Sequence, residues 1–276
     1  MHRLFILITA LLVMGCRDAR HIASSPTDAK APAPAAVDAR ATLSAMGADA
    51  VLWQNSSAEA YRLYQQGYEL ARVRLEANLK VRSELPPAVI VDIDETVLDN
   101  SPYQIDAVRD GRTFDQSDWR AWTDKASAKA SPGSVDFLVH AKNSGCSIFY
   151  ITNRDTAERA STLKNLVELG FPDAKDGHLL LMEGTSDKTE RRARVRAGHD
   201  VVLLVGDQLR DFDERFKDRS VNHGKDVVDA MADSLARYFI LLPNPMYGTY
   251  RDAVQGKGTE AEKLGRMMAW FGIKGN

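Results

Sequence analysis

The chain has few cysteines, no excess of basic charge and none of several common catalytic motifs. Two cysteines in 276 residues exclude a disulfide-stapled scaffold and a cysteine-rich zinc module. Thirty-six basic residues against 38 acidic ones give a net charge of −2, whereas a nucleic-acid binder needs a basic excess to displace phosphate counterions. The P-loop, GxSxG and HExxH patterns do not occur. With 44 % apolar and 27 % charged residues, the composition is that of a globular protein with enough chain to bury a core.

The N-terminal segment is predicted to be a processed leader. Residues 4–14 form an apolar run that is too short to span a membrane, since a spanning helix needs about 20 residues. Val13-Met14-Gly15-Cys16 resembles a bacterial lipobox. We therefore predict a lipoprotein signal peptide over residues 1–15 and lipidation of Cys16, with a plain signal peptide or a buried apolar helix as the alternatives. Arg17 stands where an aspartate typically retains lipoproteins at the inner membrane, which favours the bacterial outer membrane.

Behind the leader the chain is rich in small residues and then becomes helical. Residues 17–41 contain nine Ala and three Pro and cannot bury enough apolar surface to order themselves, so we predict a disordered tether over residues 16–41. Two helical stretches follow, Thr42–Gln54 and Ser56–Arg82. The second has three tyrosines on one face at the spacing i, i+3, i+7, which indicates a packing surface. These are Tyr61, Tyr64 and Tyr68.

The remainder of the chain alternates between apolar runs and helix-like stretches. Continuous apolar strands that alternate with helices predict a parallel sheet covered on both faces. We expect a Rossmann-like α/β domain of five strands over residues 85–276. A helical cap subdomain over residues 42–84 should pack with the 100–132 insertion and the C-terminal helix. The apolar runs are Ala88–Val91, Ser147–Ile151, Leu179–Met182, Val201–Val205 and Phe239–Leu242, and the helical stretches include Thr156–Leu169, Lys188–Ala197, Lys225–Arg237 and Thr259–Phe271.

Polar side chains follow the apolar runs at the places where parallel sheets bind ligands, beyond the carboxyl ends of the strands. Asp92 and Asp94 follow the first run, and residues i and i+2 of an extended segment share one face. Taken singly, such residues are also typical of turns, helix caps or solvated surface. Their succession, each beyond its own run, predicts one shared site. The later members are Thr152, Asn153, Lys188, Asp207 and Asp211.

These segments resemble a known superfamily. The stretches VDIDETVLDNSPY, YITNR, DKTERR, LLVGDQLRDF and LLPNPMYG are similar to those of the haloacid dehalogenase superfamily, and the resemblance covers Ala88 to Leu242. Together with the lipobox and the segment FDQSDWRAW, they resemble the class C acid phosphatases, which are secreted 5'-nucleotidase lipoproteins of bacteria. The resemblance implies a phosphatase that works outside the cytoplasm.

The two leading carboxylates suit a phosphatase with a covalent intermediate. A carboxylate with a reference pKa of ~3.9 is ionised at neutral pH, so Asp92 needs no base to attack phosphorus and form an aspartyl-phosphate. Asp94 would act as the general acid toward the leaving alcohol and then as the general base for the hydrolytic water. Because the acid must be protonated while the nucleophile is ionised, we expect activity on the acid side of neutrality.

A metal ion is needed to offset the charge of the site. Asp92, Asp207 and Asp211 would repel an anionic substrate, and Mg²⁺ is the divalent cation that suits such oxygen ligands. The resemblance implies that Asp92 and Asp207 bind Mg²⁺ through their side chains. It also implies that Asp94 binds it through its backbone carbonyl, and that Asp211 orients the site or a metal-bound water.

The phosphate and the leaving group are assigned to further residues by the same resemblance. The hydroxyl of Thr152 and the region of Asn153 would hold phosphate oxygens. Lys188 would offset the developing charge, although Arg191, one helical turn later, could do the same. For the leaving group, Trp119 and Tyr247 are expected to stack against a nucleobase, whereas Trp122 is expected to lie in the core.

The sequence thus predicts a Mg²⁺-dependent acid phosphatase or 5'-nucleotidase that is tethered to a membrane and acts on small phosphomonoesters. Two alternatives remain open. A phosphomutase on the same scaffold is disfavoured by the export signal, because sugar phosphates are cytoplasmic. A surface lipoprotein that binds a ligand without turnover is disfavoured because a binder needs no nucleophile beside an acid. The oligomeric state stays open.

Overall fold

The computed structural model describes residues 37–81 and 83–273. The predicted signal peptide, Cys16 and the predicted tether up to residue 36 lie outside these residues. Helix α1 (Ala39–Ala45) begins inside the predicted tether, because the carboxylate of Asp38 accepts backbone hydrogen bonds of 3.0 and 3.1 Å in the first turn and caps the helix. The prediction of disorder is therefore wrong for residues 39–41. Of the helices that the structure describes, none is both long enough and apolar enough to cross a bilayer.

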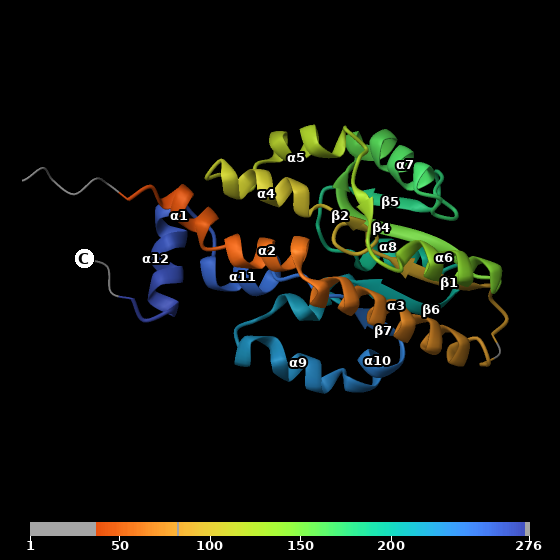
Figure 1. Cartoon of the computed structure of the whole chain (residues 1–276). Helices are drawn as coiled ribbons and strands as arrows, with labels where there is room; N and C mark the ends of the chain where they lie inside the picture. The colour runs from red at the N-terminus through yellow and green to blue at the C-terminus, as the bar shows by residue number, and fades with distance from the viewer. Residues whose placement is uncertain (1–36, 82, 274–276) are drawn as a thin grey trace, which may run out of the picture. The chain divides into compact units, whose positions relative to one another are not determined.

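The described part of the chain contains one five-stranded parallel sheet in the order β5-β4-β1-β6-β7 (Figure 1). Every apolar run of the sequence forms one of its strands, which confirms the predicted α/β fold. The main difference lies in β4, which continues four residues beyond the predicted Ile151, so that Thr152 and Asn153 belong to the strand itself. The strands are β1 (Pro87–Val91), β4 (Ser147–Asp155), β5 (Leu179–Met182), β6 (Asp200–Gly206) and β7 (Phe239–Leu241).

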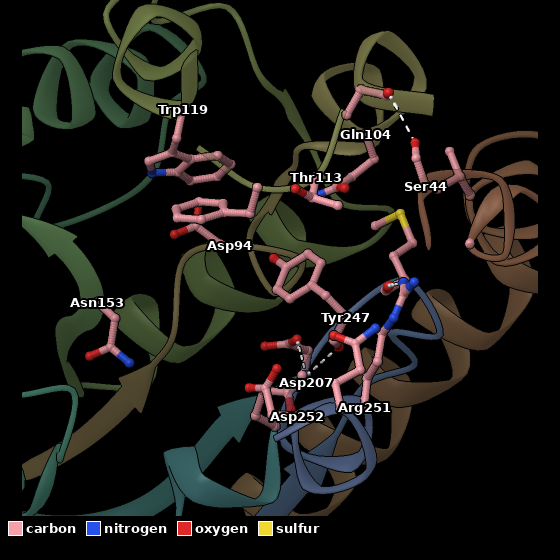
Figure 2. A pocket seen from close by; sticks show the side chains of 18 of the residues that line it. Ser44, Asp94, Gln104, Thr113, Trp119, Asn153, Asp207, Tyr247, Arg251 and Asp252 are labelled. Carbon is pink, nitrogen blue, oxygen red and sulfur yellow. Dashed lines mark hydrogen bonds between the residues drawn. The ribbon is translucent and has the colours of Figure 1, made fainter. Parts of the chain in front are cut away.

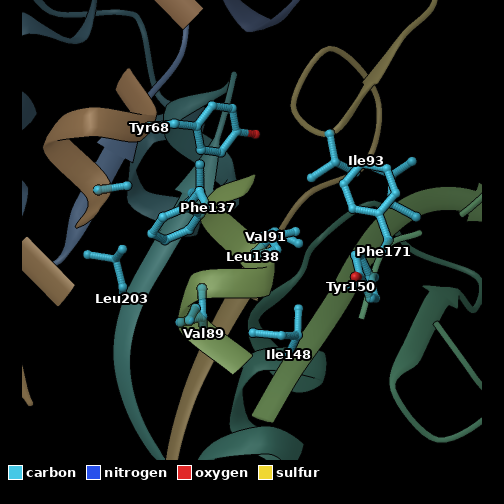
Figure 3. Packing of buried hydrophobic residues seen from close by; sticks show 14 of the residues in the cluster. Tyr68, Val89, Val91, Ile93, Phe137, Leu138, Ile148, Tyr150, Phe171 and Leu203 are labelled. Carbon is cyan, nitrogen blue, oxygen red and sulfur yellow. The ribbon is translucent and has the colours of Figure 1, made fainter. Parts of the chain in front are cut away.

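Helices cover both faces of the sheet because side chains alternate along each strand. On β1, Val89 and Val91 belong to one buried cluster and Ala88 and Ile90 to another. Figure 3 shows the first cluster, where Phe137 of α6 packs near Tyr68 of α3. Helices α3 (Ala58–Asn78), α6 (Ser134–Asn143) and α7 (Arg159–Glu168) cover this face, and α8 (Thr189–Arg196), α9 (Lys225–Ala230) and α10 (Ala232–Arg237) cover the other.

Short 3₁₀ turns join several of these elements. One of them, η2, follows β6 and carries Asp211. The helix predicted over Lys225–Arg237 is interrupted at Met231, where α9 ends and α10 begins. The turns are η1 (Thr156–Glu158), η2 (Leu209–Asp211), η3 (Glu214–Lys217) and η4 (Asn222–Gly224).

The N-terminal helices differ from the prediction in number and place. The first predicted helix is broken at Met46-Gly47 into α1 and α2 (Ala48–Ser56). Helix α3 lies against the sheet and α6, so residues 42–84 do not form a unit apart from the α/β domain. Tyr64 and Tyr68 are buried there as packing residues, whereas Tyr61 is 57 % exposed.

The insertion after β1, residues 100–132, forms a small helical subdomain, whose helices are called the roof helices below. Its ends are joined by the antiparallel pair β2 (Leu98–Asp99) and β3 (Lys129–Ala130). Between them lie α4 (Ser101–Arg109) and α5 (Gln116–Thr123). Helices α1 and α2 contact α4, and α1 also contacts the C-terminal helix α12 (Glu260–Trp270), which packs on α11 (Thr249–Gln255).

Candidate active site

Lys188 lies between two carboxylates at the carboxyl end of the sheet. Asp92 follows β1 directly, and its backbone N–H donates to the carbonyl of Val205 on β6 at 3.0 Å, which fixes the chain at this point. Lys188 is the residue before α8 and is only 3 % exposed. Its Nζ donates to Asp92 Oδ1 and, at 2.7 Å, to Asp211 Oδ1. Burial alone would lower the pKa of Lys188, but Asp211 and Asp92 raise it, so the ammonium stays charged.

Three carboxylates converge beside this lysine. Oxygen atoms of Asp92, Asp207 and Asp211 lie within 4.8 Å of one another. Asn244 Nδ2 and Gln208 Nε2 donate to Asp207 Oδ2 at 2.7 and 2.9 Å, and the backbone N–H of Gln208 donates to Asp211 Oδ2 at 2.9 Å. These donors fix the carboxylates before any cation binds. Oxygen ligands at this spacing suit a hard divalent cation such as Mg²⁺.

The shifted pKa values of these carboxylates also favour a cation at this position. Burial raises the pKa of Asp92 well above its usual range, Lys188 opposes the rise, and the neighbouring carboxylates add to it. Burial and Asp211 raise the pKa of Asp207 to about 7. A single lysine thus offsets only part of the crowded negative charge. A divalent cation would favour the charged form of these carboxylates, so the residues present fit such an ion.

Asp94 is held by a separate set of donors. Arg154 donates to Asp94 Oδ1 through Nη2 at 2.8 Å and through Nε at 3.0 Å, and Asn100 Nδ2 donates to the same oxygen at 2.9 Å. Asn100 is itself fixed, since Trp122 Nε1 donates to its Oδ1 at 2.8 Å. Trp122 packs on the core as predicted, but its indole N–H also supports the site.

Of the two β4 residues predicted to hold phosphate oxygens, Asn153 lines the cavity and Thr152 is buried behind it. Thr152 is fully buried, and its hydroxyl lies 3.4 Å from Asp94 Oδ2 and accepts the backbone N–H of Arg154 at 3.1 Å. Asn153 lines the cavity. Arg191 donates to the carbonyl of Thr152 and, at 2.8 Å, to Asn153 Oδ1. Within the described residues it therefore holds the end of β4, while Lys188 contacts the carboxylates.

A cavity of about 570 Å³ opens over these groups. Trp119 and Tyr247 both line it, as Figure 2 shows. Trp119 is only 9 % exposed, and Tyr103 packs edge-on against it with ring centroids 5.2 Å apart. Farther from the carboxylates, the wall is formed by residues of α1, α4, α11 and α12. These include Leu43, Gln104, Arg251, Gln255 and Lys263.

Four residues of the site received no role from the sequence. Arg154 and Asn100 contact Asp94, and Asn244 and Gln208 contact Asp207. Arg154 could have been found, because it stands two residues after Thr152 on an extended strand and so shares its face. Asn100, Asn244 and Gln208 lie in loops or at helix ends, where spacing alone does not show which way a side chain points.

Comparison with known proteins identifies the family. Residues 17–250 match the family described as HAD superfamily, subfamily IIIB (Acid phosphatase). The chain belongs to this family. Enzymes of the superfamily use a divalent metal, and the chain has the aspartate triad for one.

Solved structures agree with this assignment. The class C acid phosphatase from Bacillus anthracis with tungstate bound is 37 % identical and superposes with a TM-score of 0.78 over 82 % of this chain and 97 % of that one. A second structure of the class C acid phosphatase from Bacillus anthracis is 38 % identical, at the same TM-score and coverage.

Two plant proteins are more distant relatives. "Acid phosphatase 1" from Solanum lycopersicum is 30 % identical over 167 residues, and "Stem 31 kDa glycoprotein" from Glycine max is 28 % identical over 166 residues. Each match covers 57 % of this chain. The chain spans 57 % and 58 % of the length of these two relatives.

Proposed function

We propose that the protein is a Mg²⁺-dependent acid phosphatase that hydrolyses phosphomonoesters through an aspartyl-phosphate on Asp92. The observation that carries the proposal is the grouping of Asp92, Lys188 and the carboxylates of Asp207 and Asp211 at one end of the sheet. A bound Mg²⁺ would supply neutralisation of the charge on the substrate phosphate. The acid phosphatase family favours this function over a binding protein or a phosphomutase.

The protein's own groups can carry both steps. In the first, an oxygen of Asp92 forms a bond to phosphorus while the bond to the leaving oxygen breaks, and Asp94 gives that oxygen a proton. In the second, water attacks the phosphorus, Asp94 takes a proton from it, and the bond to Asp92 breaks. Lys188 stabilises the charge that develops beside Asp92, since its ammonium is already in place.

Nucleoside 5'-monophosphates are the proposed substrates. The cavity is large enough for a nucleoside, and Trp119 and Tyr247 offer aromatic surface in its wall. The Bacillus anthracis enzyme binds tungstate, a tetrahedral oxyanion like phosphate, which supports oxyanion binding by a protein of this family. From the lipobox we further propose that the enzyme acts outside the cytoplasm, anchored through Cys16 to the bacterial outer membrane.

Release of phosphate from adenosine 5'-monophosphate tests the proposal. The full-length protein in mild detergent should release phosphate with Mg²⁺ and stop when EDTA is added. Asp92→Asn should abolish release, while Asp176→Asn, which changes an exposed aspartate paired with Arg159, should leave it intact. Release that survives in folded Asp92→Asn would exclude this nucleophile. No release from any phosphomonoester by the folded wild-type protein would exclude the activity.

A further inference from the structure

The two oxygens of the Asp94 carboxylate have very different surroundings. Oδ1 accepts three hydrogen bonds of 2.8–3.0 Å, two from Arg154 and one from Asn100. Oδ2, among the described residues, has two contacts of 3.4 Å each, from Thr152 Oγ1 and Arg154 Nε. The side chain of Asp94 is partly accessible and lines the cavity.

This asymmetry decides which oxygen can exchange a proton. An oxygen that already accepts three N–H donors has no room for a proton of its own, because a proton there would point at another donor. Oδ2 has only the two longer contacts of 3.4 Å, which leave room for a proton on it. The carboxylate is also prevented from turning over, since Arg154 grips Oδ1 from two nitrogens of a planar guanidinium.

We propose that Arg154, together with Asn100, is the positioning residue of the reaction: it holds Oδ1 of Asp94 so that Oδ2 gives the proton to the leaving group and later takes it from water. This inference rests on the proposed phosphatase function. In this role Arg154 does not itself touch the substrate. It acts by fixing the general acid in one orientation.

Arg154 is well fixed for this task. The residue is 2 % exposed, and Nη1 donates to Thr162 Oγ1 on α7 at 3.1 Å. Burial alone would lower the pKa of Arg154, but Asp94 and more distant carboxylates raise it, so the guanidinium stays charged. A charge-assisted, two-nitrogen contact of this kind holds a carboxylate more firmly than a neutral donor does.

Both positioning residues are supported by tryptophans of helix α5. The guanidinium of Arg154 lies over the ring of Trp119 at 5.8 Å from the centroid, and Trp122 holds Asn100. The cation–ring contact helps to hold the guanidinium in place. Trp119 also lines the cavity. The side chain that would meet the leaving group therefore also contacts Arg154, which orients Asp94.

The proposal predicts a dependence on the leaving group. When the phosphorus–oxygen bond of a nucleotide breaks, the electron pair stays on the 5' oxygen, which is a strongly basic alkoxide and needs the proton of Asp94. A 4-nitrophenolate is stable without a proton. Misplacing the acid should therefore slow the transfer of the phosphoryl group from a nucleotide to Asp92 and leave its transfer from 4-nitrophenyl phosphate largely unaffected, whereas general damage to the site would slow both. The later attack of water is the same step for both esters and follows release of the leaving group, so it does not enter kcat/KM.

The test compares kcat/KM for these two esters in the full-length protein. In Arg154→Lys the value for adenosine 5'-monophosphate should fall by about 100-fold, the lower end of the usual contribution of general acid catalysis, and the value for 4-nitrophenyl phosphate by less than about tenfold. Asn100→Ser removes one of the three donors and should give the same pattern more weakly. It also keeps the test decisive if Arg154→Lys does not fold. Arg74→Lys is the matched control, because Arg74 is a part-buried arginine of α3 that donates to the carbonyls of Leu235 and Phe239.

Equal losses on both esters in the folded variants would overturn the positioning role while leaving the phosphatase function intact. Unchanged kcat/KM on both esters would overturn it as well. Failure of the proposed function is distinct, since the wild-type protein would then hydrolyse neither ester.

Discussion

Lys188 and Arg191 lie one helical turn apart at the start of α8 and hold different parts of the site. Lys188 contacts the carboxylates of Asp92 and Asp211, while Arg191 contacts the carbonyl of Thr152 and the side chain of Asn153. The sequence left open which of the two cations faces the nucleophile. The contacts favour Lys188 for charge stabilisation and give Arg191 a structural part at the end of β4.

Replacing these two cations should therefore have unequal effects. Lys188→Met removes the charge beside Asp92, so we expect kcat to fall by about 100- to 1000-fold. Arg191→Lys keeps a charge but loses contacts to β4, so we expect mainly a higher KM. Steady-state kinetics measure both, with Lys164→Met as a control at an exposed lysine. A larger loss of kcat in Arg191→Lys than in Lys188→Met would reverse the assignment.

The stability of the metal-free protein should fall as the pH rises. The pKa of Asp207 is about 7 in the folded state against ~3.9 in an unfolded chain, and that of Asp92 is shifted in the same direction. Between about pH 4 and pH 7 the folded protein therefore holds protons that the unfolded chain has released, so the free energy of unfolding declines as pH increases. We expect a higher melting temperature in EDTA at about pH 5 than at about pH 7.5.

Mg²⁺ should counteract this decline, because it binds the folded, ionised cluster. Its addition should raise the melting temperature more at about pH 7.5 than at about pH 5, by about 2–4 °C for each kcal/mol of stabilisation. Asp207→Asn should flatten the pH dependence in EDTA and weaken the response to Mg²⁺, and Asp176→Asn should change neither. A metal-free protein that grows more stable toward neutral pH would contradict the raised pKa of the cluster.

Two tyrosines of α3 support the backbone of the segment that follows Asp94. Tyr64 donates to the carbonyl of Glu95 at 2.6 Å and Tyr68 to that of Thr96 at 2.8 Å. Tyr68→Phe leaves a buried carbonyl without its donor, so we expect a loss of about 1–3 kcal/mol in the free energy of unfolding. Urea denaturation measures the loss. Tyr61→Phe on the exposed face of the same helix should be neutral, and equal effects in the two variants would argue against support of this segment.

Tyr247 should matter for large leaving groups. It lines the cavity opposite the roof helices, and loss of base stacking costs about 1–3 kcal/mol. Tyr247→Ala should raise KM for adenosine 5'-monophosphate by about tenfold and leave KM for a small alkyl phosphate unchanged, so the small ester is the internal control. If both KM values rise together, Tyr247 shapes the phosphate site and not the leaving-group wall.

The strands could be predicted from the sequence because a strand buried on both faces of a parallel sheet is a continuous apolar run. Leu179–Met182 forms β5 with the predicted ends, β1 and β7 differ by one residue at one end, and β6 is longer by one residue at each end. Helix boundaries were less predictable. On either side of the break at Met46-Gly47, α1 and α2 both contact the separate helix α4, a contact that local sequence does not reveal.

The site, too, was predictable only in part from the sequence. The acidic residues Asp92, Asp207 and Asp211 could be placed together because each follows a strand of one sheet. The residues that orient them could not. Asn244 reaches Asp207 from a loop, and Asn100 reaches Asp94 from the turn before α4. Such contacts depend on loop conformation, which has no period in the sequence.

Contacts of α3 with the sheet do not depend on an intact peptide connection between α3 and β1. Leu75 is buried in the core cluster, and Asn78 Nδ2 donates to the carbonyl of Val202 on β6 at 2.8 Å, whereas residues 83–86, which lead from α3 to β1, are exposed. A protease cut in this connector would sever the backbone and leave these contacts in place. The two fragments should stay associated as a working enzyme, whereas deleting everything before β1 would remove α3 from the face of the sheet that it covers together with α6 and α7.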